Sequence, residues 1–113
     1  MRPSYCMILT NIAARAEFSE EKMGKLTLAK GGYLYAGLNC FLPGQEHKAH
    51  THQGQDKMYV ILEGSGEAMV GEHISEVTAG DLVLAPSGVV HSLRNTSAAN
   101  LVVLVVFAPP PSK

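Results

Sequence analysis

Turn-forming glycines divide the last two thirds of this chain into short segments. They stand in clusters at 43–44, 63–66, 71–72, 79–81 and 86–88, most of them beside Pro, Asp or Ser. A turn is therefore expected at intervals of roughly seven to ten residues in much of this region. The segments between the turns are rich in Val, Ile, Leu, Tyr and Met, which favours strands over helices. This pattern predicts an all-β sandwich or barrel, formed by a single domain that spans residues 1–113.

The segments between the turns give the expected strands. These lie at residues 33–42, 58–63, 67–70, 73–77, 82–85, 91–95 and 101–107. Residues 70–73 should form a tight hairpin, with Gly71 free to adopt a positive φ. Residues 11–22 have room for a helical turn only. The longest apolar run, residues 101–108, is far shorter than the roughly 20 residues of a membrane-spanning helix, and is interpreted as a buried strand.

The composition is that of a globular chain without a strong charge bias. Hydrophobic residues make up 46% and charged residues 17%, and the formal net charge is −1. This argues against a nucleic-acid groove and against an anionic-membrane patch, both of which need clustered positive charge. The apolar run 5–9 is too short for a signal peptide, so a cytoplasmic location is expected. Cys6 and Cys40 are then two free thiols in a reducing compartment.

The histidines carry the clearest chemical signal. His50 and His52 are separated by one residue, so on a strand both would project from the same face. Two imidazoles at that spacing can reach one divalent ion at about 2.0–2.2 Å. His91 follows a Pro-Ser-Gly turn and opens another apolar strand. His47 is expected in a loop and His73 on the surface, so neither is assigned a role at the site.

Two motifs in this region resemble those of the cupins. The first is a glycine, five residues, HxH, three or four residues, a glutamate, six residues and a glycine; here it runs from Gly44 to Gly64 with four residues after His52. The second is a glycine, five residues, PxG, two residues, a histidine, three residues and an asparagine, and residues 80–95 match it at every fixed position. The spacer between the motifs is short, as in compact single-domain bacterial cupins of the conserved-barrel (cupin 2) type.

The resemblance implies a fold and a set of metal ligands. The fold would be a single antiparallel β-barrel of the jelly-roll type, with an N-terminal arm and first strands in 1–32, a barrel core in 33–108 and a tail in 109–113. His50, His52 and His91 match the family's three histidine ligands, and Asn95 matches a structural asparagine. The resemblance also implies a divalent transition metal inside the barrel, with Fe, Zn, Ni and Mn as candidates, and often a dimer.

Lys57 occupies the position of the family's glutamate, and a protonated amine cannot ligate a cation. Three interpretations follow. The three histidines bind the metal alone and leave open positions; or Asp56 supplies the carboxylate, although a one-residue shift places it on the opposite strand face from Lys57; or Lys57 fills a pocket that holds no metal. The first interpretation is favoured.

Two functions fit this site. The first is a metal-binding cupin that acts on a small organic molecule by oxygenase, isomerase or lyase chemistry, with a neutral Lys57 as a candidate base. The second is a binding or sensing module without catalysis. A homodimer is expected, because a small barrel exposes sheet edges and the run 5–9 is apolar enough to pair with a neighbour. Side chains expected in the interior, with core packing as their default role, are Tyr33, Tyr35, Phe41, Met58 and Tyr59.

Overall fold

The computed structural model describes residues 7–110, and the run 5–9 therefore lies only partly within them. Nine strands follow a short 3₁₀ helix, η1 (Ile12–Arg15), which confirms the helical turn expected near the N-terminus. The strands are β1 (Gly24–Lys30), β2 (Tyr35–Phe41), β3 (Glu46–His50), β4 (Asp56–Glu63), β5 (Ser65–Val70), β6 (His73–Thr78), β7 (Leu82–Ala85), β8 (His91–Arg94) and β9 (Leu101–Ala108). Within the described residues, no helix is long and apolar enough to cross a membrane.

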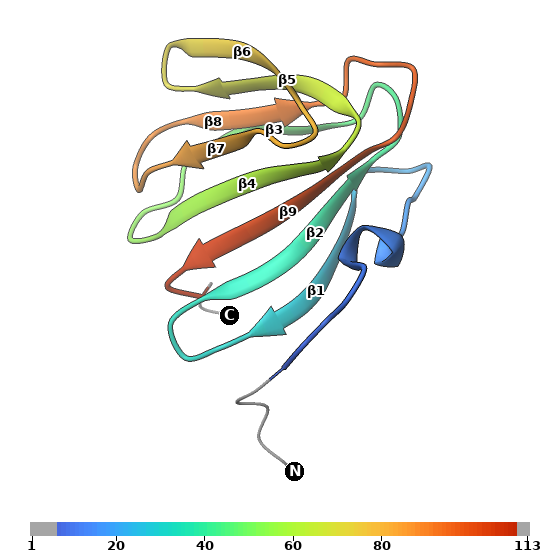
Figure 1. The fold of residues 1–113 in the computed structure, drawn as a ribbon. Helices are drawn as coiled ribbons and strands as arrows, with labels where there is room; N and C mark the ends of the chain where they lie inside the picture. The colour runs from blue at the N-terminus through green and yellow to red at the C-terminus, as the bar shows by residue number, and fades with distance from the viewer. Residues whose placement is uncertain (1–6, 111–113) are drawn as a thin grey trace.

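The strands form two antiparallel sheets that face each other (Figure 1). The five-stranded sheet has the order β1-β2-β9-β4-β7, and the four-stranded sheet has the order β3-β8-β5-β6. The all-β prediction is confirmed. The strand pairing yields two separate sheets, however, and closure into one continuous barrel is not part of it.

The core fills the space between the two sheets. On the five-stranded sheet, Val103 and Val105 of β9 and Tyr59 of β4 point inward; on the four-stranded sheet, Leu93 of β8 does so. Alternation along each strand sends the next residue to the other face. Met58, next to Tyr59, is therefore on the outer face, and Tyr33 is exposed. The expectation that these two side chains lie inside is wrong.

The strands that the sequence pattern does not delimit are β1 and β3. β3 is too polar to be recognised as a strand from its sequence, since four of its five residues are Glu, His or Lys. It is an edge strand that pairs with β8 alone, and charged side chains are common on edge strands. The hairpin at Gly71, by contrast, is confirmed, and this glycine has a φ of 59°.

Candidate metal centre and ligand cavity

His50 and His91 are directly paired residues on two neighbouring strands. His50 ends β3 and His91 begins β8, and the register of the sheet places them opposite each other. Paired residues of an antiparallel ladder point to the same face. Their ring centroids lie 4.2 Å apart at one end of the space between the sheets.

His52 reaches the same point from a loop. β3 ends at His50, so the expectation that both residues of the HxH pair lie on one strand is wrong. The loop is fastened instead to the turn at 86–88: the amide of Gly88 donates to the carbonyl of His52 at 2.7 Å, and the amide of Gly54 donates to Ser87 Oγ at 2.8 Å. These bonds give the Pro-Ser-Gly turn a role in holding His52 beside His50, with ring centroids 4.7 Å apart.

The three histidines are arranged as a metal centre would need them. One nitrogen from each ring lies within 4.8 Å of one nitrogen from each of the others. His50 Nδ1 donates to the Lys48 carbonyl at 2.6 Å, and His91 Nδ1 donates to the Val89 carbonyl at 3.0 Å. Because Nδ1 carries the proton, Nε2 carries the lone pair. The Nε2 atoms of all three rings are buried and have no hydrogen-bond partner among the described residues.

Burial keeps these imidazoles neutral. Desolvation is the main cause that lowers the pKa of His50, His52 and His91, and for His91 the pKa falls to about 4. The charge of Lys57 lowers all three pKa values further. Neutral rings with free Nε2 lone pairs are the form that binds a transition metal. The three histidines are thus positioned to bind one.

Lys57 lies inside the molecule, and Asp56 lies outside it. The Lys57 side chain is only 1% exposed, and its Nζ lies 4.8 Å and 5.0 Å from the ring centroids of Tyr59 and Phe107. Asp56 is exposed, and its Oδ1 accepts a hydrogen bond from the amide of Ser87 at 3.0 Å. It is absent from the cluster of candidate ligands found within residues 7–110.

His47 does not lie where its sequence context predicts. It lies in β3 rather than in a loop, is half-buried, and its Nδ1 is 3.4 Å from Lys57 Nζ. Its ring centroid is 4.1 Å from that of His50. Burial first, and then the charge of Lys57, lower the pKa of His47 to about 3. His73 is exposed, as expected.

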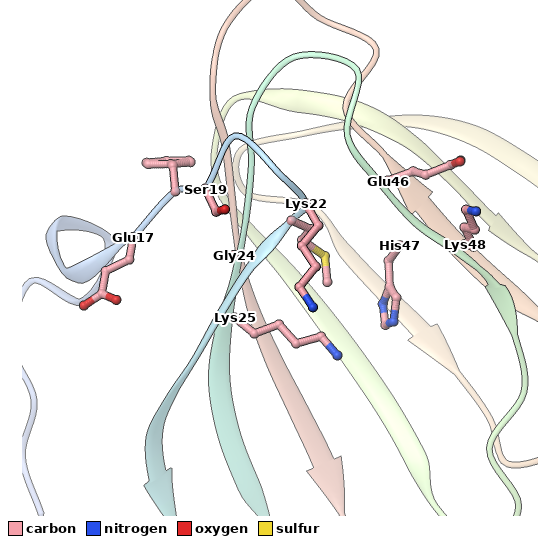
Figure 2. Close-up of a pocket in the computed structure, with 10 residues that line it drawn as sticks. Glu17, Ser19, Lys22, Gly24, Lys25, Glu46, His47 and Lys48 are labelled. Carbon is pink, nitrogen blue, oxygen red and sulfur yellow. The ribbon is translucent and has the colours of Figure 1, made fainter.

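Two cavities lie beside these histidines: His47 and His52 line the first, and His47 lines the second. The inner cavity has a volume of about 320 Å³ and lies between the sheets; its lining includes Lys25, Tyr35, Asn39, His47, His52, Lys57, Val105 and Phe107. An outer groove of about 660 Å³ runs between the segment 17–25 and β3 (Figure 2). Of the aromatic residues expected inside, Tyr35 lines the inner cavity, while Phe41 and Tyr59 belong to the core.

The two antiparallel sheets and the three convergent histidines define the class of this protein. It is a small all-β protein with three histidines positioned to bind a metal ion. The family model for the cupin domain matches residues 37–107, which is more than half of the chain. The chain therefore belongs to the cupin family.

The chain is also similar to several known proteins. The crystal structure of TT1209 from Thermus thermophilus superposes with a TM-score of 0.88 at 37% identity, covering 93% of this chain and 100% of that one. An uncharacterized protein of Aquifex aeolicus is 35% identical over 60 residues, 53% of this chain and 49% of that protein. An oxalate-binding protein of Thermotoga maritima is 34% identical over 65 residues, 58% of this chain and 54% of that protein. The chain thus spans about half the length of these curated relatives.

Proposed function

We propose that the protein binds a divalent transition metal through His50, His52 and His91 and acts on a small organic anion in the inner cavity. The observation that carries this proposal is the set of three buried Nε2 atoms, which lack any partner among the described residues and lie within one ion's reach of one another. Buried polar atoms are nearly always paired in proteins, so three convergent ring nitrogens without a protein partner in residues 7–110 support a bound cation.

The charge of the cavity supports an anionic ligand. Lys25 and Lys57 both line it, and no carboxylate does among the described residues. The name of the Thermotoga maritima relative gives independent support for a small carboxylate. Bound Fe would supply dioxygen chemistry, and bound Zn, Ni or Mn would supply Lewis-acid polarisation of a ligand oxygen. Lys57 would orient the anion by its charge, or accept a proton from it when the amine is neutral.

The test is metal stoichiometry in matched variants. Chelator-treated protein is dialysed against Zn²⁺, Ni²⁺, Mn²⁺ or anaerobic Fe²⁺, and bound metal is measured by mass spectrometry. We expect one ion per chain in the wild type, none in His91→Ala and one in His73→Ala, which removes an exposed histidine. Retention of a stoichiometric ion by a folded His91→Ala variant would contradict the proposal.

A second candidate is a ligand-binding or sensing module without catalysis. The absence of carboxylates among the described lining residues favours it, because the cavity then lacks the commonest acid–base groups other than histidine. A screen of small organic acids with metal-loaded protein, in air and under nitrogen, separates the two. Oxygen uptake or product formation supports an enzyme, whereas saturable binding without turnover supports the module.

We also propose that the chain forms a homodimer through the outer face of the five-stranded sheet. Two apolar rows cross this face in register: Leu26, Leu38, Leu104, Val60 and Leu82 in one row, and Ala36, Val106, Met58 and Leu84 in the other. The segment before β1 packs over the β1–β2 end through Ala16. The β7 end stays open, with Leu82 at 58% and Leu84 at 53% exposure. An apolar patch of this kind supports a protein partner, and a second copy supplies the same surface.

A further inference from the structure

The inner cavity and the outer groove lie next to each other. Lys25 and His47 line both of them. The groove lies beside the edges of β1 and β3, which pair with no other strand on that side. A ligand that extends from the histidine cluster into the groove would pass Lys25 and His47, and no strand ladder crosses between these two edges.

Each end of this path carries positive charge. At the inner end, Lys57 is almost fully buried, and no ion pair links it to a carboxylate among residues 7–110, where the one ion pair joins Arg94 and Glu67. At the outer end, the side chains of Lys22 and Lys25 point into the groove, toward His47. The groove is also lined by Glu17 and Glu46, whose carboxylates point away from these two lysines (Figure 2). A buried ammonium without a counter-ion is costly, so an anion beside Lys57 would stabilise it.

The walls between the two charged ends carry apolar side chains beside the polar Asn39 and His47. Val105 and Phe107 line the inner cavity together with the ring of Tyr35. Met23 and Phe18 line the outer groove. Such walls hold methylene or aromatic groups rather than a hydrated polar chain.

The volumes set the size of the ligand. Binding sites for molecules of drug size occupy roughly 300–1,000 Å³. The inner cavity, at about 320 Å³, reaches that range, and the groove adds about 660 Å³. A two-carbon acid would leave most of this space unfilled.

We infer that the ligand is an elongated dicarboxylic acid, with one carboxylate beside Lys57 and the histidine cluster and the other between Lys22 and Lys25. The apolar middle of the acid lies against Phe107, Val105 and Met23. This inference rests on the proposed function, since the inner carboxylate needs the metal centre, and it adds the chain length and the outer charged end of the ligand.

The test is a length series on the metal-loaded protein. Zn²⁺-loaded protein is titrated by calorimetry, at low ionic strength, with oxalate, succinate, adipate and suberate. We expect the dissociation constant to fall at least tenfold from oxalate to the best of the longer acids. Lys22→Glu should remove most of that gain and leave oxalate binding within about twofold, because Lys22 lines only the outer groove.

Lys30→Glu is the matched control, since Lys30 is an exposed lysine at the far end of β1 and lines neither the cavity nor the groove. It should leave both oxalate and the longer acids unaffected. Equal affinity for all four acids, or no effect of Lys22→Glu on the longer ones, overturns the inference and leaves the proposed function standing. Failure of the wild type to hold metal, read from the same sample, overturns the proposed function and this inference with it.

Discussion

Lys57 carries an ionisable amine at an almost fully buried position. Burial is the main cause that lowers its pKa from 10.5 to about 7, and the charge of Lys25 adds to this. The unfolded chain therefore binds more protons than the folded one between these two values. Burial of the protonated amine therefore lowers the free energy of unfolding. This cost has its full value below about pH 7, decreases as the pH rises, and vanishes above the unfolded pKa of 10.5.

Replacing this amine should stabilise the metal-free protein. Each unit of pKa shift corresponds to about 1.4 kcal/mol, so Lys57→Met should raise the free energy of unfolding by a few kcal/mol at pH 7. The gain should shrink toward zero near pH 10.5. Urea denaturation of both proteins in chelator, at pH 7 and pH 10, measures it. A gain that is the same at both values would show that charge is not the cause.

Restoring an acid at the same position should strengthen metal binding. Lys57→Glu replaces a repelling cation by an anionic oxygen donor, so the metal dissociation constant should fall at least tenfold. Competition with a chromophoric chelator measures the change. Asp56→Asn is the control, because Asp56 is exposed and bonded to the Ser87 amide. If Asp56→Asn loses metal as His91→Ala is expected to, the carboxylate comes from Asp56 instead.

At the scale of elements, β3 shows what a sequence alone leaves hidden. Residues three apart on a regular strand point to opposite faces. The register of β3 shifts between His47 and His50, so both side chains face the space between the sheets. An irregularity of this kind inserts an extra residue into one strand. Nothing in the residues 47–50 marks this irregularity. The loop expected at His47 has a different origin, the charged residues around it, which hide the strand.

The predictable part of the fold comes from its turns and buried strands. Gly44, Gly64, Gly80 and Gly88 all have positive φ, where side chains are disfavoured, so their spacing reports the backbone directly. The apolar strand β9 is recognisable because none of its residues before Ala108 is exposed: its inward side chains are mostly buried, and Leu104 and Val106 on its outer face are half-buried. The spacing of the three histidines likewise identifies the cluster. Its cavity depends on the long-range pairing of β2 with β9, which no local pattern encodes.

Substitutions at two of these glycines should distinguish the cost of backbone strain from the cost of a steric clash. Gly44 and Gly64 have φ values of 85° and 88°, but a Cβ on Gly64 would lie 2.3 Å from the Asn100 carbonyl oxygen, and one on Gly44 would meet nothing within 4 Å. Gly44→Ala should cost about 1 kcal/mol from the positive φ alone. Gly64→Ala should cost at least about 1 kcal/mol more, because overpacking adds to the strain. Thermal unfolding of both variants measures the difference, and equal losses would contradict a clash at Gly64.

At the scale of the whole molecule, the outer face of the five-stranded sheet predicts association. The wild type should have twice the mass of one chain by light scattering at tens of micromolar. Leu84→Arg places a charge in the open part of the apolar rows and should yield the mass of a single chain. Ile74→Arg changes a similarly exposed residue on the other sheet and should not. A monomeric wild type would contradict the homodimer.

The two sheets also tie the site to the core. His50 and His91 belong to the four-stranded sheet and Lys57 and Phe107 to the five-stranded sheet, while core side chains such as Tyr59 fill the space between the layers. The thickness of that packing sets how far apart the two halves of the site stand. Substitution of the buried residues during evolution is therefore constrained in two ways, by folding and by ligand binding. Lineages that exchange one ligand for a longer or shorter one should carry compensating changes far from any contacting atom.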